Sequence, residues 1–334
     1  MRCALAGRER RPVLIRHVRR IAILGAALVA SACTTVDRDH RPVPQVDYHQ
    51  HLVSRAFAPI VKRPERDGAA LIRELDEAGA RLAVVLSVGY SLADERKALP
   101  DPDRLTREEN DWTSDQVARH APRLIGFCSA NPLRQAALAE LERCLRLPGM
   151  VGIKVHMGNS GVSLHDPNHV GRMKQLFALA ERLQAPIVIH LRPRSPAENY
   201  GPEDAKIFIE QLLSEAPDIE VVVAHLAGTG PGYPEQTDRV MAAFAQAALR
   251  HDPRMRNVYF DVATDVAAES TPEEGALVAL RIRQIGVHRV LYGSDLTPPG
   301  GTIRAGWEIF RAKVPLTGAE MQRIAANRTR FALN

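Results

Sequence analysis

Eight short apolar runs recur between residues 45 and 295, and almost every run is followed by a stretch with helical spacing. The run at 83–88 is nearly continuous in apolar residues, which is typical of a strand covered on both faces. Strands that alternate with helices in this way indicate a parallel sheet. Eight strands close a (β/α)8 TIM barrel, and the length of the chain suits that fold. The sequence therefore predicts a single-domain barrel over residues 45–334.

The expected strands lie at 45–52, 83–88, 124–128, 150–156, 186–190, 219–225, 258–262 and 290–295. Thr271 and Thr317 are each followed three residues later by a glutamate, a capping box that marks the start of a helix. A doubly wound open sheet is the structural alternative. No Gly-x-Gly-x-x-Gly motif follows the first strand, so the sequence favours the closed barrel.

Residues 1–32 have the pattern of an export signal. Several arginines precede an apolar run at 21–32, which is shorter than the roughly 20 residues that a spanning helix needs. Cys33 follows Ala-Ser-Ala, which resembles the lipobox of bacterial lipoproteins. That resemblance implies that Cys33 is the lipidated first residue of a periplasmic, membrane-anchored protein, with 33–44 as a tether. A cleaved signal without lipid, or an N-terminal anchor helix, is the alternative.

The signal segment also explains the basic composition of the chain. The net charge is +5, yet residues 1–32 alone contribute seven arginines and one glutamate, which leaves about −1 for residues 33–334. The mature part has no basic stripe, so nucleic acid is not an expected partner. Two of the four cysteines, Cys128 and Cys144, lie in the barrel region. An oxidising compartment permits a disulfide, but we expect these two to be buried free thiols.

Residues that can bind a metal or move a proton gather at the ends of the expected strands. His49 and His51 end the first strand, and alternation along a strand places residues i and i+2 on one face. The other members of this set are Lys154, His156, His190, His225 and Asp295. In a TIM barrel the carboxyl ends of all strands meet at one rim, where catalytic groups lie. Imidazole and carboxylate ligands suit zinc and similar divalent ions.

This constellation resembles the amidohydrolase superfamily, and more narrowly its amidohydrolase-related branch of metal-dependent hydrolases. The stretches that carry the resemblance are Asp47–His51, Gly152–His156, His190, His225 and Gly293–Asp295, supported by 109–112, 126–132 and 324–327. It extends over residues 45–333, almost the whole mature chain. The set is specific to the superfamily but not to one substrate.

The resemblance implies a role for each of these residues. His49, His51, His190 and Asp295 are expected to bind the metal, most simply zinc, and Asp295 is also the expected general base. His225 is a ligand if two ions bind, or an acid–base group if one binds. Lys154 is a bridging carboxylated ligand in two-metal members, although one-metal members carry a similar strand. We favour one ion over two.

Other residues near these positions have less specific roles. Arg192 and Arg194 follow His190, and arginine suits a carboxylate or phosphate on a substrate. A solvated loop is the alternative for both. Tyr48 is a candidate pocket residue, with barrel packing as its alternative. Asp47 and Asp261 are expected to support the site, and Asp261 has a purely structural role as its alternative.

The sequence thus predicts an exported, metal-dependent hydrolase that attacks an amide, ester or lactone carbonyl of a small molecule. A non-oxidative decarboxylase of an aromatic or unsaturated acid is the alternative within the same branch, because it uses nearly the same residues. A non-catalytic surface-binding lipoprotein is the alternative from another class. Neither the substrate nor the oligomeric state follows from the sequence.

Overall fold

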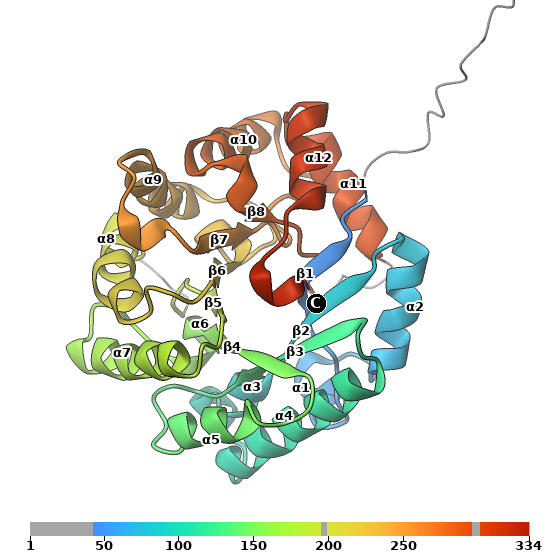
Figure 1. Cartoon of the computed structure of the whole chain (residues 1–334), viewed down its shortest axis with the longest axis vertical. Helices are drawn as coiled ribbons and strands as arrows, with labels where there is room; N and C mark the ends of the chain where they lie inside the picture. The colour runs from blue at the N-terminus through green and yellow to red at the C-terminus, as the bar shows by residue number, and fades with distance from the viewer. Residues whose placement is uncertain (1–42, 195–198, 296–300, 334) are drawn as a thin grey trace, which may run out of the picture. The chain divides into compact units, whose positions relative to one another are not determined.

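The computed structural model describes residues 43–194, 199–295 and 301–333. The chain folds into one parallel sheet whose eight strands follow the sequence order, β1 to β8, with helices around it (Figure 1). The backbone N–H of Tyr48 donates to the Tyr292 carbonyl (2.9 Å), and that of Asp295 donates to the His49 carbonyl (2.8 Å). These bonds join the segment around β8 to β1, so the two edges of the sheet meet. The predicted (β/α)8 barrel is confirmed.

The strands are β1 (Val46–Gln50), β2 (Leu82–Leu86), β3 (Leu124–Ser129), β4 (Met150–His156), β5 (Ile187–His190), β6 (Val221–Val223), β7 (Val258–Asp261) and β8 (Val290–Leu291). The α-helices are α1 (Ala58–Val61), α2 (Gly68–Ala78), α3 (Gly89–Leu92), α4 (Pro102–Arg119), α5 (Ala137–Cys144), α6 (Met157–Ser160), α7 (Pro167–Arg182), α8 (Pro202–Ile207), α9 (Glu235–Leu249), α10 (Pro272–Ile285), α11 (Ile303–Lys313) and α12 (Gly318–Ala326). Short turns of other helix types are η1 (Glu95–Lys97), η2 (Phe208–Leu212), η3 (Leu213–Glu215), η4 (Ala224–Ala227), η5 (Pro253–Met255), η6 (Val287–Arg289) and η7 (Arg330–Ala332).

Local sequence signals set several helix boundaries. The Thr271 and Thr317 hydroxyls accept from the backbone N–H groups of Glu274 and Glu320, and each glutamate accepts from the threonine N–H. Both predicted capping boxes are therefore confirmed at the starts of α10 and α12. Gly79 ends α2 in the left-handed region, with φ of 77°, where a residue with a Cβ is strained.

The apolar core has two layers. The larger layer fills the space between the outward-facing sides of the strands and the helices. The smaller layer lies inside the barrel and includes Val46, Tyr48, Phe127 and Leu291. Ala332 and Phe331 join this inner layer, so η7 lies across the N-terminal end of the barrel, as Figure 1 shows for the red C-terminal segment. Apolar side chains therefore close the inside of the barrel at that end.

Two strands are shorter than predicted at the ends that carry chemistry. We expected strands at 219–225 and 290–295, but β6 ends at Val223 and β8 at Leu291. The reason is the backbone: His225 has φ of 53° and Asp295 has φ of 60°, both in the left-handed region. Such conformations cost of order 1–3 kcal/mol each and cluster at functional sites.

The expectation of free thiols at Cys128 and Cys144 is wrong. The two residues form a disulfide between β3 and α5, with their Cα atoms 5.9 Å apart. Both side chains are fully buried. The pairing could not be read from the sequence, because it depends on how α5 returns onto the outer face of β3.

Residues from Pro42 onward form one compact unit. The predicted signal segment, Cys33 and most of the predicted tether lie outside the described residues. Within the part of the chain that the structure describes, no helix is both long and apolar enough to cross a membrane.

Candidate metal centre

A cavity of about 200 Å³ opens at the carboxyl ends of the strands. Its polar lining includes every strand-end residue that the sequence singled out: His49, His51, Lys154, His156, His190, His225 and Asp295. All of them except Asp295 and the partly exposed His156 are buried. The prediction that these residues share one rim is confirmed.

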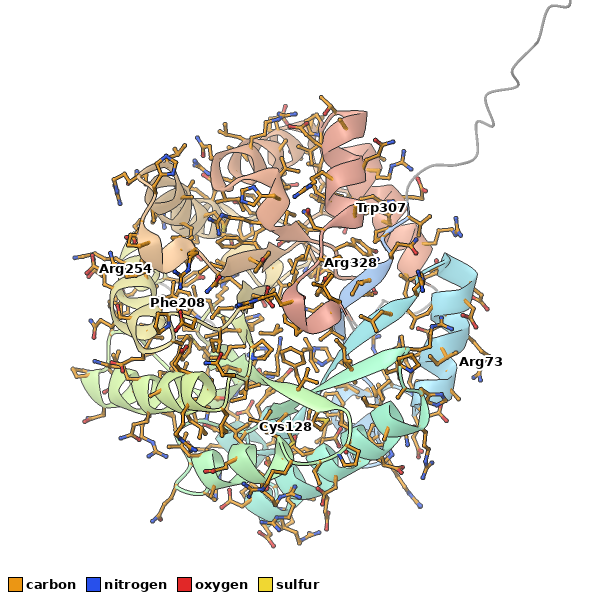
Figure 2. All side chains as sticks on the ribbon, in the orientation of Figure 1. Arg73, Cys128, Phe208, Arg254, Trp307 and Arg328 are labelled. Carbon is orange, nitrogen blue, oxygen red and sulfur yellow. A yellow bond between two sulfur atoms is a disulfide. The ribbon has the colours of Figure 1, made fainter. Side chains whose placement is uncertain are left out.

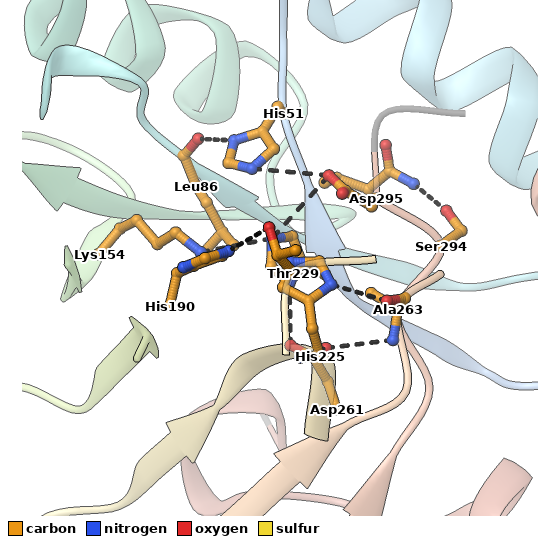
Figure 3. Close-up of polar contacts among 12 residues, drawn as sticks. His51, Leu86, Lys154, His190, His225, Thr229, Asp261, Ala263, Ser294 and Asp295 are labelled. Carbon is orange, nitrogen blue, oxygen red and sulfur yellow. Dashed lines mark hydrogen bonds and ion pairs between the residues drawn. The ribbon is translucent and has the colours of Figure 1, made fainter. Parts of the chain in front are cut away.

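Three of the four predicted ligands converge on one point. One ligand atom from each of His49, His51 and Asp295 lies within 4.8 Å of the other two. The Nε2 atoms of His49 and His51 lie 4.0 and 3.7 Å from the same Asp295 carboxylate oxygen (Figure 3). Two imidazoles and a carboxylate form a donor set that suits a divalent ion such as zinc.

The remaining nitrogen of each histidine is held by the protein. His49 Nδ1 lies 2.9 Å from an Asp261 oxygen, and His51 Nδ1 lies 2.8 Å from the Leu86 carbonyl. Both partners can only accept, so each Nδ1 carries the proton and each Nε2 keeps its lone pair. This arrangement fixes the ring and the tautomer that bind a metal through Nε2. The fit of these residues to a metal therefore rests on their hydrogen bonds as well as on their spacing.

Asp47 fixes the position of the segment that carries Asp295. Its carboxylate accepts from the Ser294 backbone N–H (3.0 Å), the Ser294 hydroxyl (2.6 Å), the Gln50 amide (2.8 Å) and the His49 N–H (3.1 Å). Burial raises the pKa of Asp47 to about 6, against the lowering effect of these donors. The predicted supporting role of Asp47 matches this network, which ties the residue before Asp295 to β1.

His225 sits beside His49, with ring centroids 4.7 Å apart. Its Nδ1 donates to the Ala263 carbonyl (2.7 Å), and its backbone N–H donates to Asp261 (2.9 Å). Asp261 thus holds both His49 and the backbone of His225 from a single position on β7 (Figure 3). The supporting role predicted for Asp261 agrees with these contacts.

His190 lies across the cavity from the group of three. Its ring stacks on His156 with centroids 3.9 Å apart, its Nε2 lies 3.1 Å from the Thr229 hydroxyl, and its buried Nδ1 has no partner in the described structure. His190 therefore lines the site but is not part of the close three-residue group. His156 also accepts from the Asn159 N–H through Nδ1, so its neutral ring presents Nε2–H elsewhere.

Lys154 reaches the same place from β4. Its Nζ lies 3.3 Å from His49 Nε2, and the side chain is buried. Burial lowers the pKa of Lys154 to about 8, although Asp261 and Asp295 oppose that shift. The ammonium is thus less costly to neutralise here than on the surface.

Burial also keeps the histidines neutral. It lowers the pKa of His51 to about 4 and holds the pKa values of His49, His156 and His190 well below their usual range. A neutral imidazole is the form that binds a metal. At neutral pH these side chains are ready to act as metal ligands.

The arginines that follow His190 do not line the cavity. Arg194 forms an ion pair with Asp94 (3.3 Å) and donates to backbone carbonyls of α6. Arg192 donates to the Gln236 amide oxygen (3.3 Å) and has no ion pair among the described residues. The structure thus explains Arg194 as a loop contact, and the lining of the cavity gives no support to the substrate-binding role predicted for Arg192.

Tyr48 does not reach the pocket. Its ring belongs to the inner apolar layer, and its hydroxyl accepts from the Thr329 N–H (3.0 Å) at the opposite end of the barrel. The register of β1 against β2 shifts between Asp47 and Gln50, so simple alternation does not describe this strand. The packing alternative for Tyr48 is therefore the one that the structure supports.

Sequence reasoning missed three residues that line the cavity: Phe57, Val88 and Tyr90. Tyr90 is buried, and burial together with the negative charge of Asp295 raises its pKa. It comes a few residues after β2, so the rule that loops after barrel strands build the site could have found it. Nothing in the local sequence distinguishes Phe57.

The family model described as amidohydrolase matches residues 46–327, which is most of the chain and nearly all of the barrel. This chain belongs to the amidohydrolase family. Among curated proteins, no sequence matches it at a significant level. The family assignment agrees with the resemblance seen at the strand ends.

Several solved structures share the fold at low sequence identity. A Burkholderia multivorans amidohydrolase with bound zinc has a TM-score of 0.57 at 13% identity, covering 85% of this chain and 96% of its own. A protein named a probable 2-pyrone-4,6-dicarboxylic acid hydrolase from Acinetobacter baumannii has a TM-score of 0.56 at 17% identity, covering 84% and 96%. The Metarhizium anisopliae IDCase has a TM-score of 0.52 at 16% identity, covering 85% and 95%.

Proposed function

We propose that this protein is a metal-dependent hydrolase that uses activated water to attack an amide, ester or lactone carbonyl. The observation that carries the proposal is the convergence of His49, His51 and Asp295 within 4.8 Å, with both imidazoles held in the metal-binding tautomer. The zinc-bound amidohydrolase and the probable pyrone hydrolase among the structural neighbours support it.

His49, His51 and Asp295 would hold the ion, and His190 would complete the set from the other wall of the cavity. A divalent ion in such a site supplies Lewis acidity and lowers the pKa of water toward 7. We favour zinc as the ion and one ion per chain, because the close group in the described residues contains three ligand side chains.

The protein's own groups then manage the proton and the substrate. Asp295 is partly exposed, with 24% of its side chain accessible, so its carboxylate can accept a proton from water in the cavity. His225 presents Nε2 toward the cavity, because its Nδ1–H is bound to the Ala263 carbonyl. We assign to His225 the transfer of a proton to or from the substrate. Arg192 lies outside the lining of the cavity, so we assign it no contact with the substrate.

The test begins with the metal content of the purified protein and the modification state of Lys154, measured by elemental analysis and mass spectrometry. One ion per chain and an unmodified Lys154 are expected. The protein is then treated with a chelator, reloaded, and assayed on esters, lactones and amides. Activity that disappears with the metal and returns with zinc supports the proposal. Two ions would overturn the one-metal site, and release of carbon dioxide from an aromatic acid without hydrolysis would favour a decarboxylase.

We also propose that the protein is exported and anchored through a lipid on Cys33. The disulfide between Cys128 and Cys144 supports export, because disulfides persist in oxidising compartments. Mass spectrometry of the protein from membranes should find a lipidated N-terminal Cys33. Cys33→Ser should move the protein to the soluble periplasmic fraction. A cytoplasmic location of the unchanged protein would contradict the proposal.

A further inference from the structure

Positive charge is concentrated at the end of the barrel opposite the metal centre. The segments that lead into the strands, together with the C-terminal segment, are 43–45, 79–81, 120–123, 145–149, 183–186, 216–220, 250–257, 286–289 and 327–333. They contain nine arginines, no lysine and three carboxylates, and the helix carboxylates Asp76, Glu142 and Glu181 contact them from outside these ranges. Residues 33–334 together have a net charge of about −1, so this basic end differs strongly from the rest of the barrel.

Five of these arginines are neutralised by ion pairs with carboxylates: Arg123, Arg146, Arg254, Arg256 and Arg330. The other four, Arg81, Arg250, Arg289 and Arg328, form no ion pair within the described ranges. Arg81 and Arg250 are exposed. The charge that is available to a partner is therefore that of the four unpaired arginines.

A hollow of about 420 Å³ lies within this end. Arg81, Arg123 and Arg328 line it, and Leu333, 66% exposed, stands at its edge. Arg328 has a buried Nη1 without a hydrogen-bond partner in the described structure. Figure 2 labels Arg328 beside the segment that lies across the barrel. Arg123 is paired with Asp76, so Arg81 and Arg328 are the two guanidinium groups around this hollow that remain for a phosphate, beside one exposed apolar side chain.

The path of the chain identifies the source of that phosphate. Gln45, near the start of the described barrel, lines the same hollow. The twelve residues from Cys33 to Pro44 can span at most about 40 Å. A barrel anchored through Cys33 would therefore stay close to the bilayer, and the end nearest the tether is the basic one.

We propose that the basic end, centred on the unpaired Arg81 and Arg328, docks on the anionic phospholipid headgroups of a membrane. The docked barrel holds its metal centre on the side away from the bilayer, open to small molecules in the surrounding solution. The contact is electrostatic and weak for each charge, and it acts together with a lipid anchor rather than in place of it.

The test uses protein that begins at Thr34, so neither a lipid nor the apolar 21–32 segment contributes. Its barrel is one compact unit with its own core, so it folds without the leader. Binding is measured by vesicle flotation with phosphatidylcholine alone and with phosphatidylcholine and phosphatidylglycerol in equal amounts. We expect binding only to the anionic vesicles and its loss as salt is raised. Equal binding to both, or to neither, would overturn the proposal.

Charge variants locate the contact. Removing one arginine near an anionic surface should weaken binding roughly fivefold, and reversing its charge roughly 25-fold. Arg81→Glu is the main variant, because Arg81 is exposed and unpaired in the described structure. Arg73→Glu on α2 is the matched control, since Arg73 is also exposed but lies outside the basic end (Figure 2). An equal loss of vesicle binding in both variants would show that the attraction is spread over the whole protein, and it would contradict the proposed docking surface.

Two further measurements keep the result interpretable. Arg328→Gln should also weaken vesicle binding, and its thermal unfolding curve shows whether the barrel is intact. Inorganic phosphate is titrated by calorimetry in the absence of vesicles. If the protein binds free phosphate but does not bind anionic vesicles, the hollow is a site for a small anion and the proposed membrane contact is wrong.

Discussion

The two ends of this barrel differ in what their side chains do, although the same strands build both. The carboxyl end gathers buried imidazoles, a lysine and carboxylates around a cavity of about 200 Å³. The N-terminal end is filled by apolar side chains, including Phe127 and Phe331, and is surrounded by arginines. The difference teaches that stability and chemistry are separable here, because β1, β4, β5, β6 and β8 contribute apolar residues to the core and lead into the reactive residues at the carboxyl end.

The largest effect should come from the carboxyl end. Asp295→Asn removes the expected proton acceptor and a ligand charge, so we expect turnover to fall by roughly 10³-fold or more. Asp295 contributes little to packing, so the thermal unfolding midpoint should change little. Steady-state kinetics and calorimetry on the same preparation check both statements. Full activity in this variant would remove Asp295 from its assigned role.

The reverse result is expected from the N-terminal end. Phe127 is fully buried, and a Cβ at Gly152 would lie 2.4 Å from its ring, so the strand pair is shaped around it. Phe127→Ala should lower the free energy of unfolding by about 4 kcal/mol. Chemical denaturation measures this loss, and turnover of the folded fraction should stay close to that of the unchanged protein. A large drop in turnover would mean that the two ends are coupled.

A buried carboxyl on the carboxyl-end side gives a test by pH. Burial raises the pKa of Glu109 from 4.5 to about 7, although its hydrogen bond from Ser54 opposes the shift. The folded protein keeps this proton while the unfolded chain loses it, so the stability contribution falls as pH rises from 4.5 to 7. Relative to Glu109→Gln, the protein should lose up to about 3 kcal/mol across that window. Parallel pH dependences of the two proteins would contradict the shift.

The smallest expected effect concerns the support of the metal ligands. Asp261→Asn keeps the size of the side chain but weakens the acceptor that orients His49 Nδ1. Loss of such a partner typically costs 10–100-fold in metal affinity. Competition with a chromophoric chelator measures the affinity. An unchanged value would show that backbone contacts alone orient His49.

Much of the fold could be predicted because its signals are local and repeated. The apolar runs around 83–88 and 150–156 became β2 and β4, and the capping boxes at Thr271 and Thr317 start α10 and α12. The gathering of His49, His51 and Asp295 followed from one rule, that strand ends share a rim.

The missed features depend on contacts distant in sequence. The disulfide between Cys128 and Cys144 requires α5 to return onto β3. The short β6 and β8 reflect left-handed backbone at His225 and Asp295. Neither residue is a glycine, so the sequence carries no signal for this conformation. The Leu86 and Ala263 carbonyls that bind His51 and His225 belong to the backbone, so no residue type in the sequence identifies them as partners.

Those carbonyl partners give the site an uneven tolerance to mutation. The acceptors for His51 and His225 belong to the backbone, so no substitution at Leu86 or Ala263 can delete them. The acceptor for His49 is the side chain of Asp261, which also holds the His225 N–H. The ring orientations of His51 and His225 therefore tolerate substitution of their acceptor residues, whereas the ring orientation of His49 depends on the side chain at position 261. Substitutions elsewhere in the pocket can therefore leave the histidine ring orientations intact, provided that position 261 keeps its carboxylate.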